Sequence, residues 1–374
     1  MSKALIISAD GLSEHTGGGI YLRGVVDGIK DEFDSTILVC KQCNNNKAER
    51  YNRIDVFEFK RTFFLDLIAR LFFQLSFIVL YTPFIISIIK RSIPDVIYIH
   101  GTKHGFLLKC ISLFTKKKII LVTDNVESAL FKRLYLEEKS FRRKIKLIFE
   151  LLCIRISESL SINNATVISF ITSHDLNVTK EKYKFKQKSM VWPVTIYDDT
   201  GKTNYDRSSY ALFTGSFKFQ PNIDAVNELH SLVKSHHCRV IVAGLSASKL
   251  DDNLKDHIEV VCTPSEDEMR SLFENALFFI SLVRFGSGMK TKVAEALKFG
   301  LPVIGTQHSF IGYEDILAND SICIIKDEDS FKQFLSRIDS SDKNELANKA
   351  YSTYRKYYSE IRSRQCASLS YSLI

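Results

Sequence analysis

The sequence predicts an α/β protein with two doubly wound domains, because apolar strands alternate with helical segments through both halves of the chain. Its 374 residues exceed the usual size of one hydrophobic core, which also favours two domains. Glycine-rich turns follow short apolar strands at residues 17–19 and 284–288. Open α/β sheets bind ligands at the carboxyl ends of their strands, so we expect both turns to line a cleft between the domains.

The first domain is predicted over residues 1–195, and it begins with a buried strand at 3–9 that leads into the first glycine turn. A helix with apolar Ile20, Val25 and Ile29 follows that turn. The turn lacks both a G-x-G-x-x-G pattern and the lysine of a P-loop, so little favours a dinucleotide or ATP site. Further strands of this domain are predicted at 35–40, 54–59, 95–100, 118–123 and 166–170.

The apolar segment from Phe63 to Ile89 allows two interpretations. Its part from Leu71 to Ile89 contains no charged residue and is long enough to cross a bilayer. Polar residues interrupt it, however, and it lies between predicted strands of one sheet, which a membrane span would separate. We therefore expect a helix or a helix pair, partly in the core and partly facing a membrane.

A basic helical stretch is predicted from Ala129 to Ser159. Its apolar residues recur at roughly helical spacing, at Phe131, Leu134, Phe141, Ile145, Ile148 and Leu152. The whole of residues 1–195 is basic, with 30 Lys and Arg against 19 Asp and Glu, whereas the remainder holds 21 against 24. A basic amphipathic helix in a basic domain fits anionic lipid headgroups, and the alternative is a solvated helix face.

The eight cysteines are scattered along the chain, and no secretion signal is expected, because the strand at 3–9 is too short for a signal core. These features predict a cytoplasmic protein with reduced thiols, placed at the inner face of the membrane if the basic helix binds lipid. Cys40-x-x-Cys43 has no matching second pair, so it gives little support to a metal or redox site.

The second domain is predicted over residues 210–349, after a polar linker at 196–209. A C-terminal helix at about 350–374 is expected to pack back on the first domain. Strands are predicted at 210–215, 238–243, 257–262, 277–282, 302–305 and 321–325. Helices are predicted between them at 222–235, 266–275, 289–299 and 328–337.

The most informative stretch is Ser281–Thr306, SLVRFGSGMKTKVAEALKFGLPVIGT. Its strand, glycine turn, helix and strand direct backbone N–H groups and the positive end of a helix dipole at one place, which suits a phosphate. Arg284, Lys290 and Lys292 add positive charge there, and Glu295 offers a carboxylate to ribose hydroxyls. The structural alternative is an ordinary Rossmann-type turn that binds no ligand.

The segment GSGMKTKVAEALKFGLPVIGT resembles the nucleotide-sugar signature of family 4 glycosyltransferases, which are retaining enzymes of GT-B fold. A second segment, YALFTGSFKFQPNIDAV at 210–226, resembles the strand and turn that open the C-terminal half of those proteins. The Gly, Lys, Glu and Gly-x-Pro-Val elements of the first segment fall in the family's order and spacing, which makes this match fairly specific. The rest of the chain agrees with the family mainly in layout.

The resemblance implies a donor site at Gly18, Gly19, Gly215, Ser216, Gly286, Ser287, Gly288 and Glu295. It implies a catalytic role for His100, which ends a strand and matches a histidine that lies against the transferred sugar; the alternative is a histidine satisfied by backbone groups. Arg284 and Lys290 are the catalytic cations, since a departing diphosphate needs positive charge when no metal is bound. Asn125 and Glu127 are weaker candidates for the acceptor site, and no metal site is expected.

The chain departs from the family pattern at two places. Many members carry two glutamates separated by seven residues, and the first of these positions is Ser287 here, which leaves the donor sugar in doubt. Many also carry an Arg/Lys pair at positions that read Ser216 and Pro221 in this chain. Arg284 or Lys290 would supply the missing charge.

We therefore expect a retaining, metal-independent glycosyltransferase without a cofactor. It would move a sugar from a nucleoside-diphosphate sugar, such as a UDP-sugar, to a glycan or lipid-linked glycan in surface-polysaccharide biosynthesis. Peripheral contact with an anionic membrane is expected, and a nucleic-acid partner is not. One alternative is a GT-B nucleotide-sugar epimerase, and the other is an inactive GT-B module that binds nucleotide or glycan.

Overall fold

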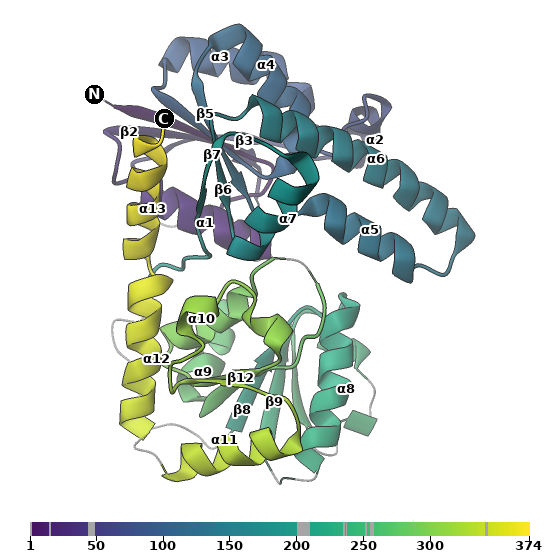
Figure 1. Ribbon diagram of the computed structural model, residues 1–374, viewed down its shortest axis with the longest axis vertical. Coiled ribbons are helices and arrows are strands. Elements are labelled where there is room, and N and C mark those ends of the chain that lie inside the picture. Colours follow the sequence, from purple (N-terminus) through teal and green to yellow (C-terminus); the bar gives the residue numbers. More distant parts are fainter. Residues whose placement is uncertain are drawn as a thin grey trace. The chain divides into compact units, whose positions relative to one another are not determined.

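The computed structural model of the chain describes residues 2–14, 16–43, 49–199, 210–234, 236, 238–250, 253–254, 258–286, 288–340 and 343–374. The chain divides into two compact units, Met1–Thr195 with Glu360–Ile374, and Ile196–Ser359 (Figure 1). Each unit is built on one parallel β-sheet with flanking helices, so the predicted pair of doubly wound α/β domains is confirmed. Residues 200–209 of the predicted linker lie outside the described part of the chain.

The sheet of the first unit has seven strands in the order β3-β2-β1-β4-β5-β6-β7. They are β1 Lys3–Ser8, β2 Ser35–Lys41, β3 Asp55–Phe59, β4 Val96–His100, β5 Lys118–Thr123, β6 Val167–Phe170 and β7 Lys188–Val191. The central strands are almost continuous runs of Ile, Val and Leu, because helices cover both faces of the sheet. Since β1, β4 and β5 are neighbours, the residues that follow them lie side by side at one edge.

The helices of the first unit are α1 Gly17–Ile29, α2 Phe63–Leu71, α3 Thr82–Ser92, α4 Gly105–Thr115, α5 Glu127–Glu137, α6 Phe141–Asn164, α7 Ser173–Tyr183 and α13 Glu360–Ser372. Alternate strand residues face different helices. Ile97 and Leu121 share a core with side chains of α3 and α4. Tyr98 points to the other face, where its hydroxyl lies 3.1 Å from Ser370 Oγ of α13.

The apolar segment at 63–89 forms α2, a 3₁₀ turn at Phe77–Tyr81 and α3. Phe77, Ile78, Ile85 and Ile89 are buried in the core of the first unit, which explains the absence of charge in this segment. Among the described residues, no helix combines the length and the apolar character that crossing a membrane requires.

The basic stretch at 129–159, expected as one helix, is a hairpin of α5 and α6. The two helices meet at Glu138, whose backbone is extended, with φ −69° and ψ 133°. Its carboxylate accepts a hydrogen bond from the N–H of Ser140 at 2.8 Å, and such local side chain–backbone bonds compete with helix continuation. Figure 1 shows the hairpin extending away from the sheet of the first unit.

The sheet of the second unit has six strands in the order β10-β9-β8-β11-β12-β13. They are β8 Tyr210–Thr214, β9 Arg239–Gly244, β10 Ile258–Cys262, β11 Phe278–Ser281, β12 Val303–Gly305 and β13 Ile322–Ile324. The helices of this unit are α8 Gln220–Lys234, α9 Glu266–Asn275, α10 Thr291–Lys298, α11 Glu328–Ser340 and α12 Lys343–Tyr357. Each predicted strand and helix of this region is present, although α10 begins at Thr291 instead of Met289.

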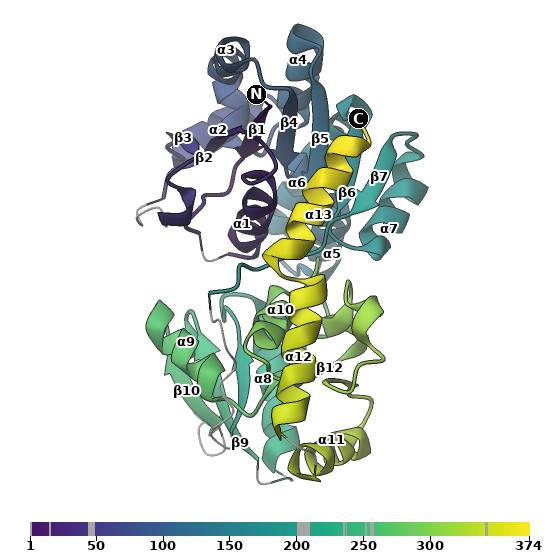
Figure 2. The ribbon, with the colours of Figure 1, turned by 90° about the vertical axis from the view of Figure 1, so that its left-hand side faces the viewer.

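The last helix, α13, belongs to the first unit, where it packs along α1 (Figure 2). The two helices approach closely at Gly28, where a Cβ would lie 2.4 Å from Ser363 Oγ of α13. The hydroxyl of Ser363 donates to the Gly24 carbonyl at 2.6 Å and accepts from Trp192 Nε1 at 3.1 Å. Helix α13 thus covers the sheet face that carries Tyr98.

Replacing Gly28 with alanine is expected to lower the free energy of unfolding by roughly 1–3 kcal/mol, the usual cost of overpacking. The new methyl group would clash with Ser363 and displace α13 from α1. Gly17→Ala is the matched control, because no heavy atom lies within 4 Å of a Cβ at that position of the same helix. Urea unfolding of both variants measures the effect, and a Gly28→Ala variant as stable as the parent would contradict the close contact.

Candidate functional site

Three polar side chains converge at the carboxyl edge of the first sheet. Asp10 follows β1, His100 ends β4 and Asp124 follows β5, and these strands are neighbours. One ligand atom from each side chain lies within 4.8 Å of the other two. Sequence reasoning selected only His100, although each of the three is a polar residue at the end of a buried strand.

His100 is 1% exposed. Its Nδ1 contacts two side chains and, in the part of the chain that the structure describes, no backbone group. This atom lies 3.1 Å from Ser8 Oγ and 3.4 Å from the Asp10 carboxylate. The imidazole also packs against Tyr21, with ring centroids 5.5 Å apart. Its Nε2 is buried without a hydrogen-bond partner among the described residues, so it remains available to a substrate atom.

His100 and Asp10 each favour the charged form of the other. Burial alone would lower the pKa of His100, but the hydrogen bond to Asp10 and the charges of Asp124 and Asp10 raise it above its ordinary value. Burial would raise the pKa of Asp10, but the hydrogen bond and charge of His100 bring it below its ordinary value. Both shifts favour a carboxylate beside an imidazolium, whose Nε2–H can donate to an oxygen of a substrate.

Lys103 and Glu127 form a second charged pair beside this cluster. Lys103 Nζ lies 2.8 Å from Glu127 Oε1, and Glu127 is 1% exposed at the start of α5. Burial raises the pKa of Glu127, and the charge of Lys103 only partly opposes this effect. Glu127 Oε2 and Asp124 Oδ1 have no hydrogen-bond partner in the described part of the chain, which is uncommon for buried polar atoms. Asn125, the other candidate for the acceptor site, is half-buried in the same loop.

Gly18 and Gly19, expected in a loop before the first helix, lie in the first turn of α1. Thr16 extends the helix upstream, because its Oγ1 accepts a hydrogen bond from the N–H of Gly19 at 3.2 Å. A Cβ at Gly18 would lie 2.9 Å from the Asp10 carboxylate. The structure therefore places the glycine turn against the cluster around His100.

Asp10, His100 and Asp124 are also the described residues that could hold a metal ion, since carboxylates and imidazoles are common ligands. His100 Nδ1 lies 3.4 Å from the Asp10 carboxylate, and a metal ion would require the ligating nitrogen to be unprotonated. An Asp-x-Asp triplet, the pattern of metal-dependent glycosyltransferases, occurs at 327–329. There, Asp327 accepts a hydrogen bond from the N–H of Ser330 at 2.8 Å at the start of α11.

In the second unit, Gly215 and Ser216 follow β8 at the carboxyl edge of the sheet. Gly244 ends the neighbouring β9, and a Cβ there would lie 1.9 Å from the Gly215 carbonyl oxygen. The amide of Asn222 on α8 donates to the Ser216 carbonyl at 2.9 Å and fixes the turn. These strand ends therefore pack backbone against backbone, which brings main-chain groups to the surface where a ligand would bind.

The turn after β11 carries the predicted diphosphate-binding residues. Gly286 and Gly288 have φ angles of 120° and 67°, which favour glycine. Lys290 is the N-cap residue of α10, and its Nζ curls back to the Gly288 carbonyl at 3.2 Å. The lysine charge and the positive end of α10 therefore meet at this turn, as an anion site requires. Ser287 lies outside the described residues.

Arg284, the other predicted catalytic cation, is engaged elsewhere. Its guanidinium group donates to both carboxylate oxygens of Glu228 on α8, at 2.7 and 2.5 Å. Both groups are largely exposed, so the pair directs the guanidinium towards α8 without burying its charge. Lys290 is therefore the stronger candidate for the stabilisation of a leaving diphosphate.

Buried hydroxyl groups hold both ends of this turn. The hydroxyl of Tyr313 donates to the Lys290 carbonyl at 2.7 Å and accepts from the N–H of Ala294 at 3.0 Å. Thr306 Oγ1 donates to the Val283 carbonyl at the other end of the turn. Sequence reasoning missed these residues, because no local pattern shows that a tyrosine and a threonine beyond α10 reach back to the turn.

Glu295 lies on α10, beyond the glycine turn. Its side chain is 24% exposed, and its Oε2 lies 2.9 Å from Lys292 Nζ, three residues earlier on the helix. The ion pair orients the carboxylate along the helix face and engages one of its two oxygens. A bound ribose would have to share this carboxylate with Lys292 or displace it.

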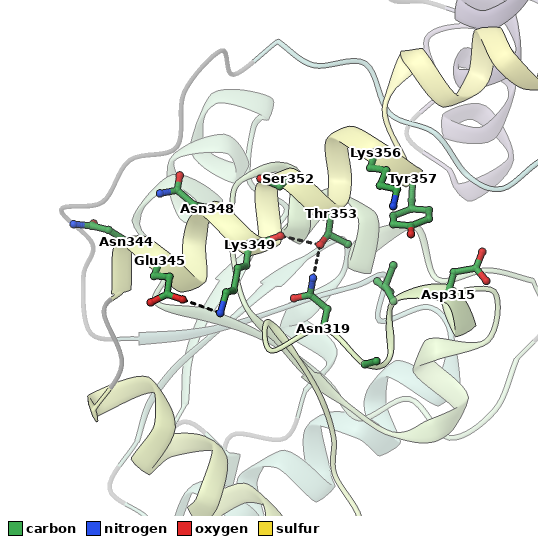
Figure 3. Close-up of a pocket in the computed structure, with 12 residues that line it drawn as sticks. Asp315, Asn319, Asn344, Glu345, Asn348, Lys349, Ser352, Thr353, Lys356 and Tyr357 are labelled. Atoms are coloured by element: carbon green, nitrogen blue, oxygen red, sulfur yellow. Dashed lines mark hydrogen bonds and ion pairs between the residues drawn. The ribbon is translucent and has the colours of Figure 1, made fainter.

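A cavity of about 750 Å³ lies in the second unit between α12 and the loop at 315–319 (Figure 3). Several of its polar side chains already bond one another. Lys349 pairs with Glu345 at 2.8 Å, and Asn319 Nδ2 donates to Thr353 Oγ1 at 2.8 Å. None of the predicted site residues lines this cavity, so it does not belong to the candidate donor site.

Replacing Asp10 with asparagine is expected to lower the pKa of His100, because it removes the carboxylate that stabilises the imidazolium. A raised folded-state pKa stabilises the fold fully below the unfolded value, near about 6.5. This stabilisation is lost as the pH rises through the folded-state pKa of His100. Asp10→Asn should therefore make the stabilisation smaller. NMR titration of the His100 ring measures the shift. Ser8→Ala, which keeps the Asp10 carboxylate, is the control. An unchanged His100 titration in Asp10→Asn would contradict this interpretation.

Residues 208–340 match the family model described as Glycosyl transferases group 1. The match spans β8 to α11 and so includes the turns at Gly215 and Gly286 as well as Glu295. A relative from Klebsiella pneumoniae is described as "Uncharacterized 44.6 kDa protein in cps region". It is 22% identical over 280 residues, which cover 67% of this chain and 68% of that protein.

Two solved structures resemble the chain over its full length. Sucrose-phosphate synthase from Thermosynechococcus elongatus has a TM-score of 0.70 at 11% identity, with 100% of this chain and 99% of that chain covered. The Anabaena protein Alr3699/HepE in complex with UDP has a TM-score of 0.66 at 11% identity, with 100% of both chains covered. The chain thus has the GT-B fold of two Rossmann-like domains, and the match over 208–340 supports a glycosyltransferase that uses a nucleotide sugar.

Proposed function

We propose that the protein is a retaining, metal-independent glycosyltransferase that moves a hexosyl group from a UDP-sugar to a glycan or lipid-linked glycan. The family match over 208–340 carries the proposal, because it contains both glycine turns of the second unit and Glu295. The likeness to a UDP complex supports uridine as the first nucleotide to test. The relative in a cps region supports a role in surface-polysaccharide biosynthesis, on the cytoplasmic side of the membrane.

In this proposal the second unit binds the donor. The N-terminal end of α10 and the ammonium group of Lys290 stabilise the diphosphate as negative charge develops on it. Glu295 accepts hydrogen bonds from the ribose hydroxyls. Because Lys290 and the helix dipole supply positive charge, the mechanism needs neither a metal nor another cofactor.

The first unit acts on the transferred sugar and the acceptor. The imidazolium of His100 donates a hydrogen bond from Nε2 to a sugar oxygen, and Asp10 keeps the ring protonated. Asp124 Oδ1 and Glu127 Oε2 accept hydrogen bonds from acceptor hydroxyls, which would give these buried atoms the partners they otherwise lack. Asn125 lies in the same loop and completes the acceptor site.

Two other functions predict different products. A GT-B nucleotide-sugar epimerase needs no acceptor and would convert the donor by itself. An inactive module would bind nucleotide or glycan without turnover. Ser287, which stands where many family members carry their first glutamate, is the residue that favours the inactive module.

Replacing Glu295 with glutamine is expected to weaken nucleotide binding by roughly 1–3 kcal/mol, the range for a hydrogen bond to a charged group. The change keeps the size of a side chain that is 24% exposed, so the fold should stay intact. Glu259→Gln is the matched control, because Glu259 lies on β10 and pairs with Arg239 at 2.9 Å. Calorimetric titration with UDP measures both variants, and equal affinity of Glu295→Gln and the parent would remove Glu295 from the site.

Incubation with a panel of nucleotide sugars, with and without glycan acceptors, tests the reaction itself. We expect release of the nucleoside diphosphate only when a suitable donor and acceptor are both present, and we expect it to persist in excess EDTA. Loss of activity in EDTA with rescue by magnesium or manganese would disprove metal independence and point to Asp10, His100 and Asp124 as metal ligands. A new nucleotide sugar formed from the donor alone would indicate an epimerase, and binding without product an inactive module.

A further inference from the structure

The exposed side of α6 carries a row of apolar side chains, at positions i, i+4, i+7, i+8, i+11 and i+15. They are Phe141, Ile145, Ile148, Phe149, Leu152 and Ile156, and their exposed fractions run from 36% to 77%. At about 100° per residue, this spacing places all of them within an arc of roughly 100°. A helix in water normally packs such a face inward, so an outward apolar row points to an interaction surface.

Helix α2 extends this row. Its exposed apolar side chains are Phe63, Phe64, Leu67 and Leu71, with exposed fractions from 47% to 84%. The ring of Phe73, just beyond α2, lies 5.7 Å from that of Phe149 on α6, centroid to centroid. Arg70 of α2 also lies 3.6 Å from Glu150 of α6. The two rows therefore join into one surface, the α2–α6 face, made of the exposed apolar side chains of 63–73 and of α6.

Buried polar contacts on the other side of α6 hold this row outward. Ser157 Oγ donates to the Thr102 carbonyl at 2.9 Å and accepts from the N–H of Gly105 at 2.9 Å. The next residue, Glu158, accepts from the N–H of Ser128 at 3.0 Å and lies 3.6 Å from Lys182 Nζ. If α6 rotated to bury its apolar row, these hydrogen bonds would break and leave buried polar groups without partners.

Positive charge borders the apolar row. The stretch 139–146 contains Lys139, Arg142, Arg143, Lys144 and Lys146 and no acidic residue. By helical spacing, Arg142 and Lys144 stand on opposite sides of the row. Arg143 and Lys146 have side chains that are 76% and 68% exposed, and they lie 3.8 Å and 3.7 Å from the carboxylates of Glu138 and Glu150. The exposed side of α6 is therefore an apolar surface with positively charged residues beside it.

We propose that the α2–α6 face docks on an anionic lipid bilayer. Its aromatic and aliphatic side chains would enter the headgroup region, and its lysines and arginines would lie against lipid phosphates. A second copy of the chain fits this face less well, because pairing two such faces would bring equal charges together. The docking is peripheral, since neither α2 nor α6 is long and apolar enough to span a membrane. None of the residues of the proposed donor and acceptor sites belongs to this face.

Sedimentation of the full chain with vesicles tests the docking. Vesicles of phosphatidylcholine with roughly one third phosphatidylglycerol should sediment the protein at low salt, and about tenfold more strongly than pure phosphatidylcholine. Salt near about 1 M should release most of it, because the Debye length then falls to about 3 Å. Failure to bind the anionic vesicles at low salt, or equal binding to both vesicles, would overturn the proposal.

A triple variant, Phe141→Ser, Ile145→Ser and Ile148→Ser, should lose at least about tenfold in vesicle affinity, since apolar burial contributes to interfacial binding. The double variant Arg142→Gln and Lys144→Gln should bind anionic vesicles less and lose part of its salt dependence. The matched control is Ile361→Ser with Leu369→Ser on α13, where side chains of 41% and 49% exposure are removed. This control should bind vesicles like the parent, and thermal unfolding checks that each variant is folded.

Two results would reject the bilayer as the partner of this face. One is unchanged vesicle binding by the triple variant. The other is a dimer of the parent, seen by light scattering, that becomes a monomer in the triple variant, since this would assign the face to a second copy. Transfer to a water-soluble acceptor is measured on the same proteins and should be equal in all of them. A failure of docking is thereby distinguished from a failure of the proposed glycosyl transfer.

Discussion

The parallel pairing of strands is the constraint on which both candidate sites depend. Parallel neighbours need a crossover between them, so every strand of a sheet delivers its carboxyl end to the same edge. In the first sheet the register pairs Ser8 with His100, which sets Asp10 beside a histidine that lies 90 positions further along the chain. In the second sheet the same rule brings Gly215 and Gly244 into backbone contact beside the turn that follows β11.

The sequence was sufficient for the fold because its signals are local. Apolar runs bounded by polar turns predict buried parallel strands, and the spacing within 286–306 predicts the glycine turn and α10. Contacts between distant residues could not be predicted in this way. The pairing of His100 with Asp10 needs the knowledge that β1 adjoins β4, and the pairing of Arg284 with Glu228 needs the position of α8. Local capping also escaped prediction, since Thr16 extends α1 through the glycines.

Burial of charged groups at the carboxyl edge of the first sheet, such as Glu127, costs free energy of desolvation. Glu127 is buried while its partner Lys103 stays 40% exposed, so one carboxylate is removed from water and only partly compensated by the lysine. The same edge also retains buried oxygen and nitrogen atoms without partners among the described residues. Apolar side chains of similar volume would avoid this cost, and the proposed acceptor would supply the partners that these atoms otherwise lack.

The position of α13 has a consequence for the synthesis of the chain. This helix covers Tyr98 and Trp192 in the first unit, yet it is encoded after the whole second unit. Chains fold from the N-terminus as they leave the ribosome, so the first sheet emerges long before its own covering helix. The nascent protein therefore exposes an aromatic surface until α13 has emerged. A premature stop codon in the second unit would leave that surface uncovered permanently.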